Sequence, residues 1–190
     1  MERMEFEGET GYVAVEAAIH VSRYLAVKKL VPNRRVLDVA CGEGYGSWLM
    51  GQWGARSVFG VDVSPEAVEH ATKRFSTDSV EFVAGPGERL QELVGQRQFD
   101  LVVSLETIEH VDDPIAFLKN IKEIASRNNA SIVISAPNDH WYYAYGGNNQ
   151  YHQRRYTFEE FKRQTESVLG KARSWNLGTL GIGFAINPIN

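Results

Sequence analysis

The sequence has one cysteine, Cys41, no long apolar run and little net charge. A single cysteine excludes a disulfide within the chain and a metal site built from several thiolates, and it favours a reducing, cytoplasmic location. No stretch reaches the roughly 18 apolar residues typical of a membrane span, and the acidic start MERMEFEGET lacks the apolar region of a secretory signal. A formal net charge of −4 gives no support to a nucleic acid partner.

The length of 190 residues and a hydrophobic content of 43% predict one soluble domain with a full core, residues 1–190. Within it we expect an N-terminal helical cap, a core, a long loop, and a C-terminal helix with strands. These four parts span residues 1–34, 35–137, 138–156 and 157–190. An apolar run just before Asn190 suggests that the chain belongs to a longer, multidomain protein and that the sheet is truncated after its last strand.

Short β-branched runs alternate with amphipathic segments along the chain. This alternation predicts an α/β fold with a doubly wound, mostly parallel sheet. The predicted strands are Arg35–Val39, Ser57–Val63, Val80–Ala84, Phe99–Leu105 and Ser131–Ser135, with weaker ones at Arg173–Leu177 and Gly183–Asn187. The predicted helices are Tyr12–Leu30, a segment from Ser64 to Phe75, one beginning at Asp113 and Pro114, and one beginning at Thr157.

A glycine-rich loop follows the first predicted strand. Its glycines, Gly42, Gly44 and Gly46, recur every second residue, unlike the G-x-G-x-x-G of dinucleotide sites. Asp38 precedes the loop, and a carboxylate there disfavours a pyrophosphate but suits a cationic ligand. S-adenosyl-L-methionine carries an ammonium and a sulfonium, so the loop predicts that cofactor rather than NAD.

Asp62 lies near the end of the second predicted strand, one residue before Val63, where a carboxylate can accept both hydroxyls of a ribose. The alternative is that Asp62 only caps the next helix. Ser64 already stands at the position expected of the cap, which favours the ribose role.

Four segments in order resemble the motifs of class I S-adenosylmethionine-dependent methyltransferases. They are VLDVACGEGYGS, VFGVDVSPEAVEHA, FDLVVSLETIEHVDDP and VISAPN. The resemblance implies a Rossmann-like fold and a transferase that carries a methyl group to an acceptor. It also implies a set of cofactor-binding residues. These are Asp38, Gly42, Gly44, Gly46, Asp62, Val63, Gly87, Glu88, Leu105 and Glu106. The chain departs from the family at Pro86, where many members have an aspartate that binds adenine.

A finer resemblance is to bacterial methyltransferases of glycan and sugar biosynthesis, which are often fused to glycosyltransferases. It rests on CGEGYGS, ETIEHV and the segment Tyr151–Phe161. It implies a small hydroxylated acceptor such as a nucleotide sugar or glycan. The alternatives are a phenol, a quinone precursor or another small molecule, or a cofactor-binding module without activity.

His110 and His152 are the candidate catalytic residues, because an oxygen nucleophile benefits from a general base. The alternative for each is a structural or surface histidine. Asp112 and Asp113 precede a proline, which is typical of a helix cap, so we expect no metal site and no effect of EDTA on activity. The aromatic loop Asn138–Tyr156 is predicted to close over the acceptor.

Overall fold

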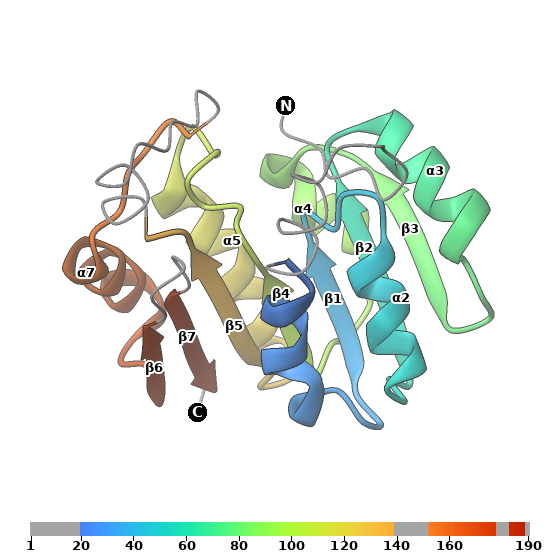
Figure 1. Cartoon of the computed structure of the whole chain (residues 1–190), viewed down its shortest axis with the longest axis horizontal. Helices are drawn as coiled ribbons and strands as arrows, with labels where there is room; N and C mark the ends of the chain where they lie inside the picture. The colour runs from blue at the N-terminus through green and yellow to red at the C-terminus, as the bar shows by residue number, and fades with distance from the viewer. Residues whose placement is uncertain (1–19, 139–151, 178–182, 189–190) are drawn as a thin grey trace. The chain divides into compact units, whose positions relative to one another are not determined.

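The computed structural model describes residues 20–138, 152–177 and 183–188, drawn in colour in Figure 1. The predicted lid falls largely outside these residues, as do the first eight residues of the predicted helix Tyr12–Leu30. By its internal contacts the chain divides into two compact units, Met1–Gly87 and Glu88–Asn190. Among the described helices, none is both long and apolar enough to cross a membrane.

The first unit contains three parallel strands in the order β3-β2-β1. Residues 20–27 are helical and continue into a 3-10 turn before the first strand. Helices α2 and α3 connect the strands and pack against them (Figure 1). The elements are η1 Lys28–Leu30, β1 Arg35–Val39, α2 Tyr45–Gln52, β2 Ser57–Asp62, α3 Pro65–Phe75 and β3 Val80–Ala84.

The inner strands of this unit are buried almost throughout, because a parallel strand between crossover helices faces the core on both sides. Helix α3 begins as predicted. The Ser64 hydroxyl accepts the backbone N–H of Ala67, and Pro65 occupies the first helical position.

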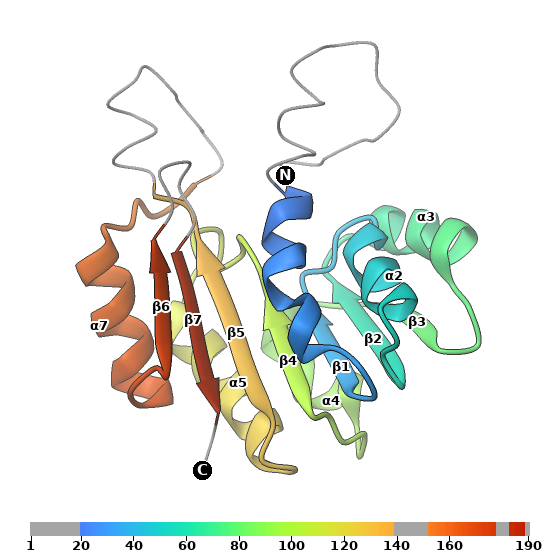
Figure 2. The same ribbon diagram turned by 60° about the horizontal axis from the view of Figure 1, so that its bottom comes forward.

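The second unit combines a parallel pair with two antiparallel strands. Strands β4 and β5 are parallel, and β5 continues antiparallel to β7 and then β6. Helix α7 packs against α5 and runs alongside β7 (Figure 2). The elements are α4 Leu90–Val94, β4 Leu101–Ser104, α5 Pro114–Ser126, β5 Ser131–Ala136, α7 Phe158–Leu169, β6 Ser174–Leu177 and β7 Gly183–Pro188, with the 3-10 turn η2 Gly87–Arg89 leading into α4.

The sequence predicted each of these strands, but two predictions need adjustment. Strand β4 covers only Leu101–Ser104, because Phe99 and Leu105 are buried without joining the ladder. The short helix α4 was not predicted, since five residues are too few to display a helical period. The helix caps at Asp113 and Thr157 were predicted. Asp113 accepts the N–H groups of Ile115 and Ala116, and Thr157 forms a capping box with Glu160.

Candidate active site

The loop between β1 and α2 is tied to the end of β2. The N–H groups of Ala40 and Cys41 both donate to the Val61 carbonyl, at 2.8 and 3.1 Å. Ala40 adopts a left-handed backbone with φ 63°, a conformation that costs a non-glycine residue about 1–2 kcal/mol. The spacing of the glycines in the sequence did not predict the strained backbone of Ala40. Strain of this kind concentrates at functional sites, which fits a loop shaped for a ligand.

Asp38 lies in β1 with no exposed surface. Its carboxylate accepts the hydroxyls of Ser47 at 2.6 Å and Tyr24 at 3.3 Å. Burial raises the pKa of Asp38 from 3.8 to about 7, although the bonds from Ser47 and Tyr24 act in the opposite direction. The unliganded unit therefore holds a carboxyl group that is half protonated near neutral pH and gains from a nearby positive charge.

Asp62 ends β2 and organises the same loop. Its two oxygens accept the backbone N–H groups of Gly42 at 2.8 Å and Ser64 at 2.9 Å. Ser64 supplies the side-chain cap of α3, so Asp62 is not needed for that purpose. A carboxylate oxygen accepts more than one hydrogen bond, which leaves acceptor capacity for a ribose. Beside it, the apolar side chain of Val63 is 49% exposed.

The three glycines of the loop have different surroundings. Gly42 has φ +55°, and a Cβ built there meets nothing within 4 Å, so this glycine faces open space. A Cβ at Gly46 would lie 2.0 Å from the Tyr24 ring, so this glycine allows Tyr24 to approach Asp38. A Cβ at Gly44 would lie within 3 Å of the side chains of Ala71 and Phe82. A Gly44→Val variant would thus disturb packing first, and it does not isolate ligand contact.

Gly42→Ala is the sharper test of the loop. We expect it to weaken S-adenosylhomocysteine binding about 10- to 100-fold, because the added methyl group enters the open space and strains the turn. Gly54→Ala is the matched control, since Gly54 has φ +85° and equally open surroundings but lies outside the loop. Both variants should lose about 1–2 kcal/mol of folding stability. Equal cofactor affinity of the two variants, measured by calorimetry, would remove Gly42 from the site.

The other predicted cofactor residues lie at strand ends or just beyond them. Gly87 and Glu88 lie in the turn η2, and the Glu88 side chain is outside the described part of the chain. Leu105 and Glu106 follow β4 directly. Glu106 has φ 53°, and Ser135 holds it in place. The Ser135 hydroxyl donates to Glu106 Oε1 at 2.6 Å, and the Glu106 N–H donates to the Ser135 oxygen at 3.1 Å.

The two candidate catalytic histidines meet in the second unit. The rings of His110 and His152 lie 4.9 Å apart, edge to face. His110 Nε2 is 3.7 Å from Glu109 Oε1, and the Glu109 residue is fully buried. The sequence analysis considered each histidine singly and assigned no role to Glu109. Their proximity could not be predicted from the sequence, because the histidines lie 42 positions apart.

Backbone contacts bring His152 to this position. The N–H groups of Gln153 and Arg154 both donate to the Glu109 carbonyl, at 3.0 and 3.2 Å. The Arg154 guanidinium donates to the carbonyls of Val111 and Asp112. The C-terminal end of the predicted lid is therefore bound directly to the turn after β4.

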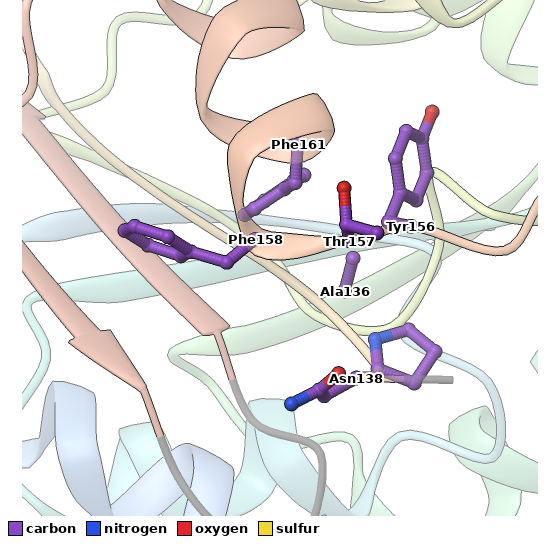
Figure 3. Close-up of a pocket in the computed structure, with 7 residues that line it drawn as sticks. Ala136, Asn138, Tyr156, Thr157, Phe158 and Phe161 are labelled. Atoms are coloured by element: carbon purple, nitrogen blue, oxygen red, sulfur yellow. The ribbon is translucent and has the colours of Figure 1, made fainter. Parts of the chain in front are cut away.

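A small hollow marks the two ends of the predicted acceptor loop. Asn138 and Tyr156 both line it, together with residues of β5 and the start of α7 (Figure 3). Its volume of about 10 Å³ has room for about one water molecule, so it is too small to hold an acceptor. The full lining is Ala136, Pro137, Asn138, Tyr156, Thr157, Phe158 and Phe161.

Comparison with known proteins identifies the family. A family model described as a methyltransferase domain matches residues 12–172. The chain belongs to this methyltransferase family. The sequence-based prediction of a class I methyltransferase is thereby confirmed.

Relatives of the methyltransferase agree with this assignment. Ubiquinone biosynthesis O-methyltransferase of Xanthomonas campestris is 36% identical over 98 residues, covering 50% of this chain and 40% of that protein. The mitochondrial enzyme of the same name from Schizosaccharomyces pombe is 36% identical over 106 residues, covering 53% of this chain and 37% of its own length. The chain thus spans less than half the length of these curated relatives.

The predicted fold is confirmed by solved structures. Magnesium protoporphyrin IX methyltransferase from Synechocystis, determined with bound S-adenosylhomocysteine, superposes with a TM-score of 0.68 at 17% identity. The alignment covers 95% of this chain and 90% of that one. Family and fold together support the predicted cofactor, S-adenosylmethionine.

Proposed function

We propose that the methyltransferase transfers the methyl group of S-adenosylmethionine to an oxygen of a small phenolic acceptor of the quinone-precursor class. The acceptor chemistry is inferred from the side-chain cluster of Glu109, His110 and His152. The names of the relatives favour a phenolic acceptor over the sugar or glycan expected from the sequence. A phenolic quinone precursor is also a small hydroxylated molecule, which is the general class of acceptor expected from the sequence.

The proposed cofactor site lies in the loop of the first unit. Asp38 would attract the cofactor ammonium, while Asp62 would accept the ribose hydroxyls. Exposed Val63 offers an apolar surface to the adenine, where no aspartate is available at Pro86. The glycines Gly42, Gly44 and Gly46 shape the loop, whereas the roles of Gly87, Glu88, Leu105 and Glu106 rest on the family resemblance alone.

The acidity of the acceptor hydroxyl supports a phenol. A phenol has a pKa of about 10, as in tyrosine, whereas the pKa of water is about 15.7 and that of an aliphatic alcohol lies nearer to water. A histidine base can assist the ionisation of a phenol far more readily than that of a sugar hydroxyl. The paired histidines His110 and His152 thus suit a phenolic oxygen.

A panel of acceptors tests this proposal. Full-length protein is incubated with S-adenosylmethionine and a dihydroxybenzoate, a nucleotide sugar or no acceptor, and S-adenosylhomocysteine is quantified. We expect the dihydroxybenzoate to raise product formation at least about tenfold above the reaction without acceptor. Turnover with the nucleotide sugar alone would restore the sugar interpretation. Cofactor binding without turnover of any acceptor would favour the non-catalytic alternative.

A further inference from the structure

The cluster around His110 contains the donors of a metal site. Glu109, His110 and His152 each offer one ligand atom, and these atoms all lie within 4.8 Å of one another. The carboxylate residue is fully buried, and the two histidines are partly buried. Two imidazoles and one carboxylate form a ligand set that divalent transition metals accept.

The distances between the donors are close to those that a metal imposes. Ligand bonds of about 2.0–2.2 Å in a tetrahedral site bring neighbouring donor atoms to roughly 3.4 Å from each other. The separation of 3.7 Å between His110 Nε2 and Glu109 Oε1 is already near that value. The widest separation needs to close by roughly 1 Å or somewhat more, which a side-chain rotation of partly buried His152 can supply.

A divalent cation would stabilise the ionised form of the buried Glu109 carboxyl. Buried carboxylates in proteins are paired with charge or coordinate metals, because a low-dielectric interior strongly disfavours an isolated ionised group. His110 Nε2 lies 3.7 Å from that carboxylate, in the range of an ion pair rather than of a direct hydrogen bond. A divalent ion between the donors would replace this longer contact with two short ligand bonds.

The backbone holds the three donors together before any ion arrives. Glu109 and His110 are adjacent in the turn after β4, and the Glu109 carbonyl anchors the N–H groups of Gln153 and Arg154. His152 immediately precedes this anchored pair. Since these contacts use main-chain atoms, they remain when the metal-binding side chains are replaced.

We propose that Glu109, His110 and His152 bind a divalent transition metal ion, for which zinc is the probe. This replaces the expectation of metal independence, which considered Asp112 and Asp113 rather than this cluster. Three protein ligands leave a coordination position open. On the proposed function, an ion there would hold the acceptor hydroxyl and lower its pKa, so that its proton would pass to solvent. The oxygen would then form the new C–O bond as the methyl–sulfur bond of S-adenosylmethionine breaks and S-adenosylhomocysteine leaves.

Zinc binding to the full chain, freed of any affinity tag, tests the site without cofactor or acceptor. Calorimetry is expected to show one zinc ion per chain in this site. His110→Ala and His152→Ala should each weaken zinc binding by about 10- to 100-fold, as should Glu109→Gln. His70→Ala is the control, since His70 is half exposed beside Glu43 in the first unit and should leave the affinity unchanged.

Two further measurements test the metal site. Substitution with cobalt should give visible d–d absorption bands in the wild-type protein that vanish in the His110→Ala/His152→Ala variant. Unchanged S-adenosylhomocysteine affinity of the variants verifies that they are folded. Equal zinc affinity and stoichiometry in the wild-type protein and the folded double variant would overturn the metal site. Because no methyl acceptor is present, that result is independent of whether the proposed acceptor is correct.

Discussion

Asp38→Asn is expected to weaken S-adenosylhomocysteine binding about 100- to 1,000-fold at pH 8, because it removes the carboxylate charge that we propose pairs with the cofactor ammonium. The substitution keeps the size of the side chain and its ability to accept from Ser47 and Tyr24. Removing one partner of such a pair typically costs about 3–5 kcal/mol, since the other charge then lacks compensation. Calorimetry at pH 8 measures the loss.

The same substitution should stabilise the unliganded protein at high pH. The pKa of Asp38 rises from 3.8 to about 7 on folding. The protonated carboxyl thus favours the folded state fully below about pH 4, and this contribution is lost as the pH rises from about 4 through 7. The asparagine of the variant has no proton to lose, so the melting temperature of the variant at pH 8 should exceed that of the wild-type protein by several degrees.

Asp62→Asn is the matched control for this pair of effects. It should also weaken cofactor binding, but it should lower stability, because an amide cannot accept from both Gly42 and Ser64 as the carboxylate does. Wild-type binding at pH 6.5 should further release about half a proton or more to the buffer, and Asp38→Asn should release less. A variant at position 38 that binds normally at pH 8 would exclude Asp38 from ammonium recognition.

His110→Ala and His152→Ala are each expected to lower kcat by about 100- to 10,000-fold, with cofactor affinity unchanged. The range is that of a lost general base or a lost activator of the acceptor oxygen. Single-turnover kinetics with the dihydroxybenzoate measure the effect. Activity retained in both variants would remove the cluster from the chemistry.

Much of the fold follows from local sequence patterns. Strand β1 is buried and carries near-continuous apolar residues, so it was predicted with its observed bounds. Strand β3, in which only Val80 is buried, was also predicted with its observed bounds, from its short apolar and β-branched run. Ser64, Asp113 and Thr157 indicated where their helices begin, because capping depends on only a few neighbouring residues. Strand β2 begins at Ser57 as predicted and ends at Asp62, one residue before its predicted end at Val63.

The remaining features depend on contacts between distant segments. Ala40 is held in a left-handed conformation by the Val61 carbonyl, which the residue type does not reveal. The small size of Gly46 is explained by the Tyr24 ring, which comes from an earlier helix. The partnership of His110 with His152 depends on the segment after His152 binding back to the turn that follows β4. Sequence spacing carries no signal for such contacts.

A crystal structure of the full-length protein with S-adenosylhomocysteine tests the central claim most directly. The account predicts that both ribose hydroxyls lie within hydrogen-bond distance of the Asp62 carboxylate and that the cofactor passes over Gly42. The ammonium should lie on the side of the loop where Asp38 is buried. A cofactor bound away from the loop, with Asp62 contacting only Gly42 and Ser64, would contradict it.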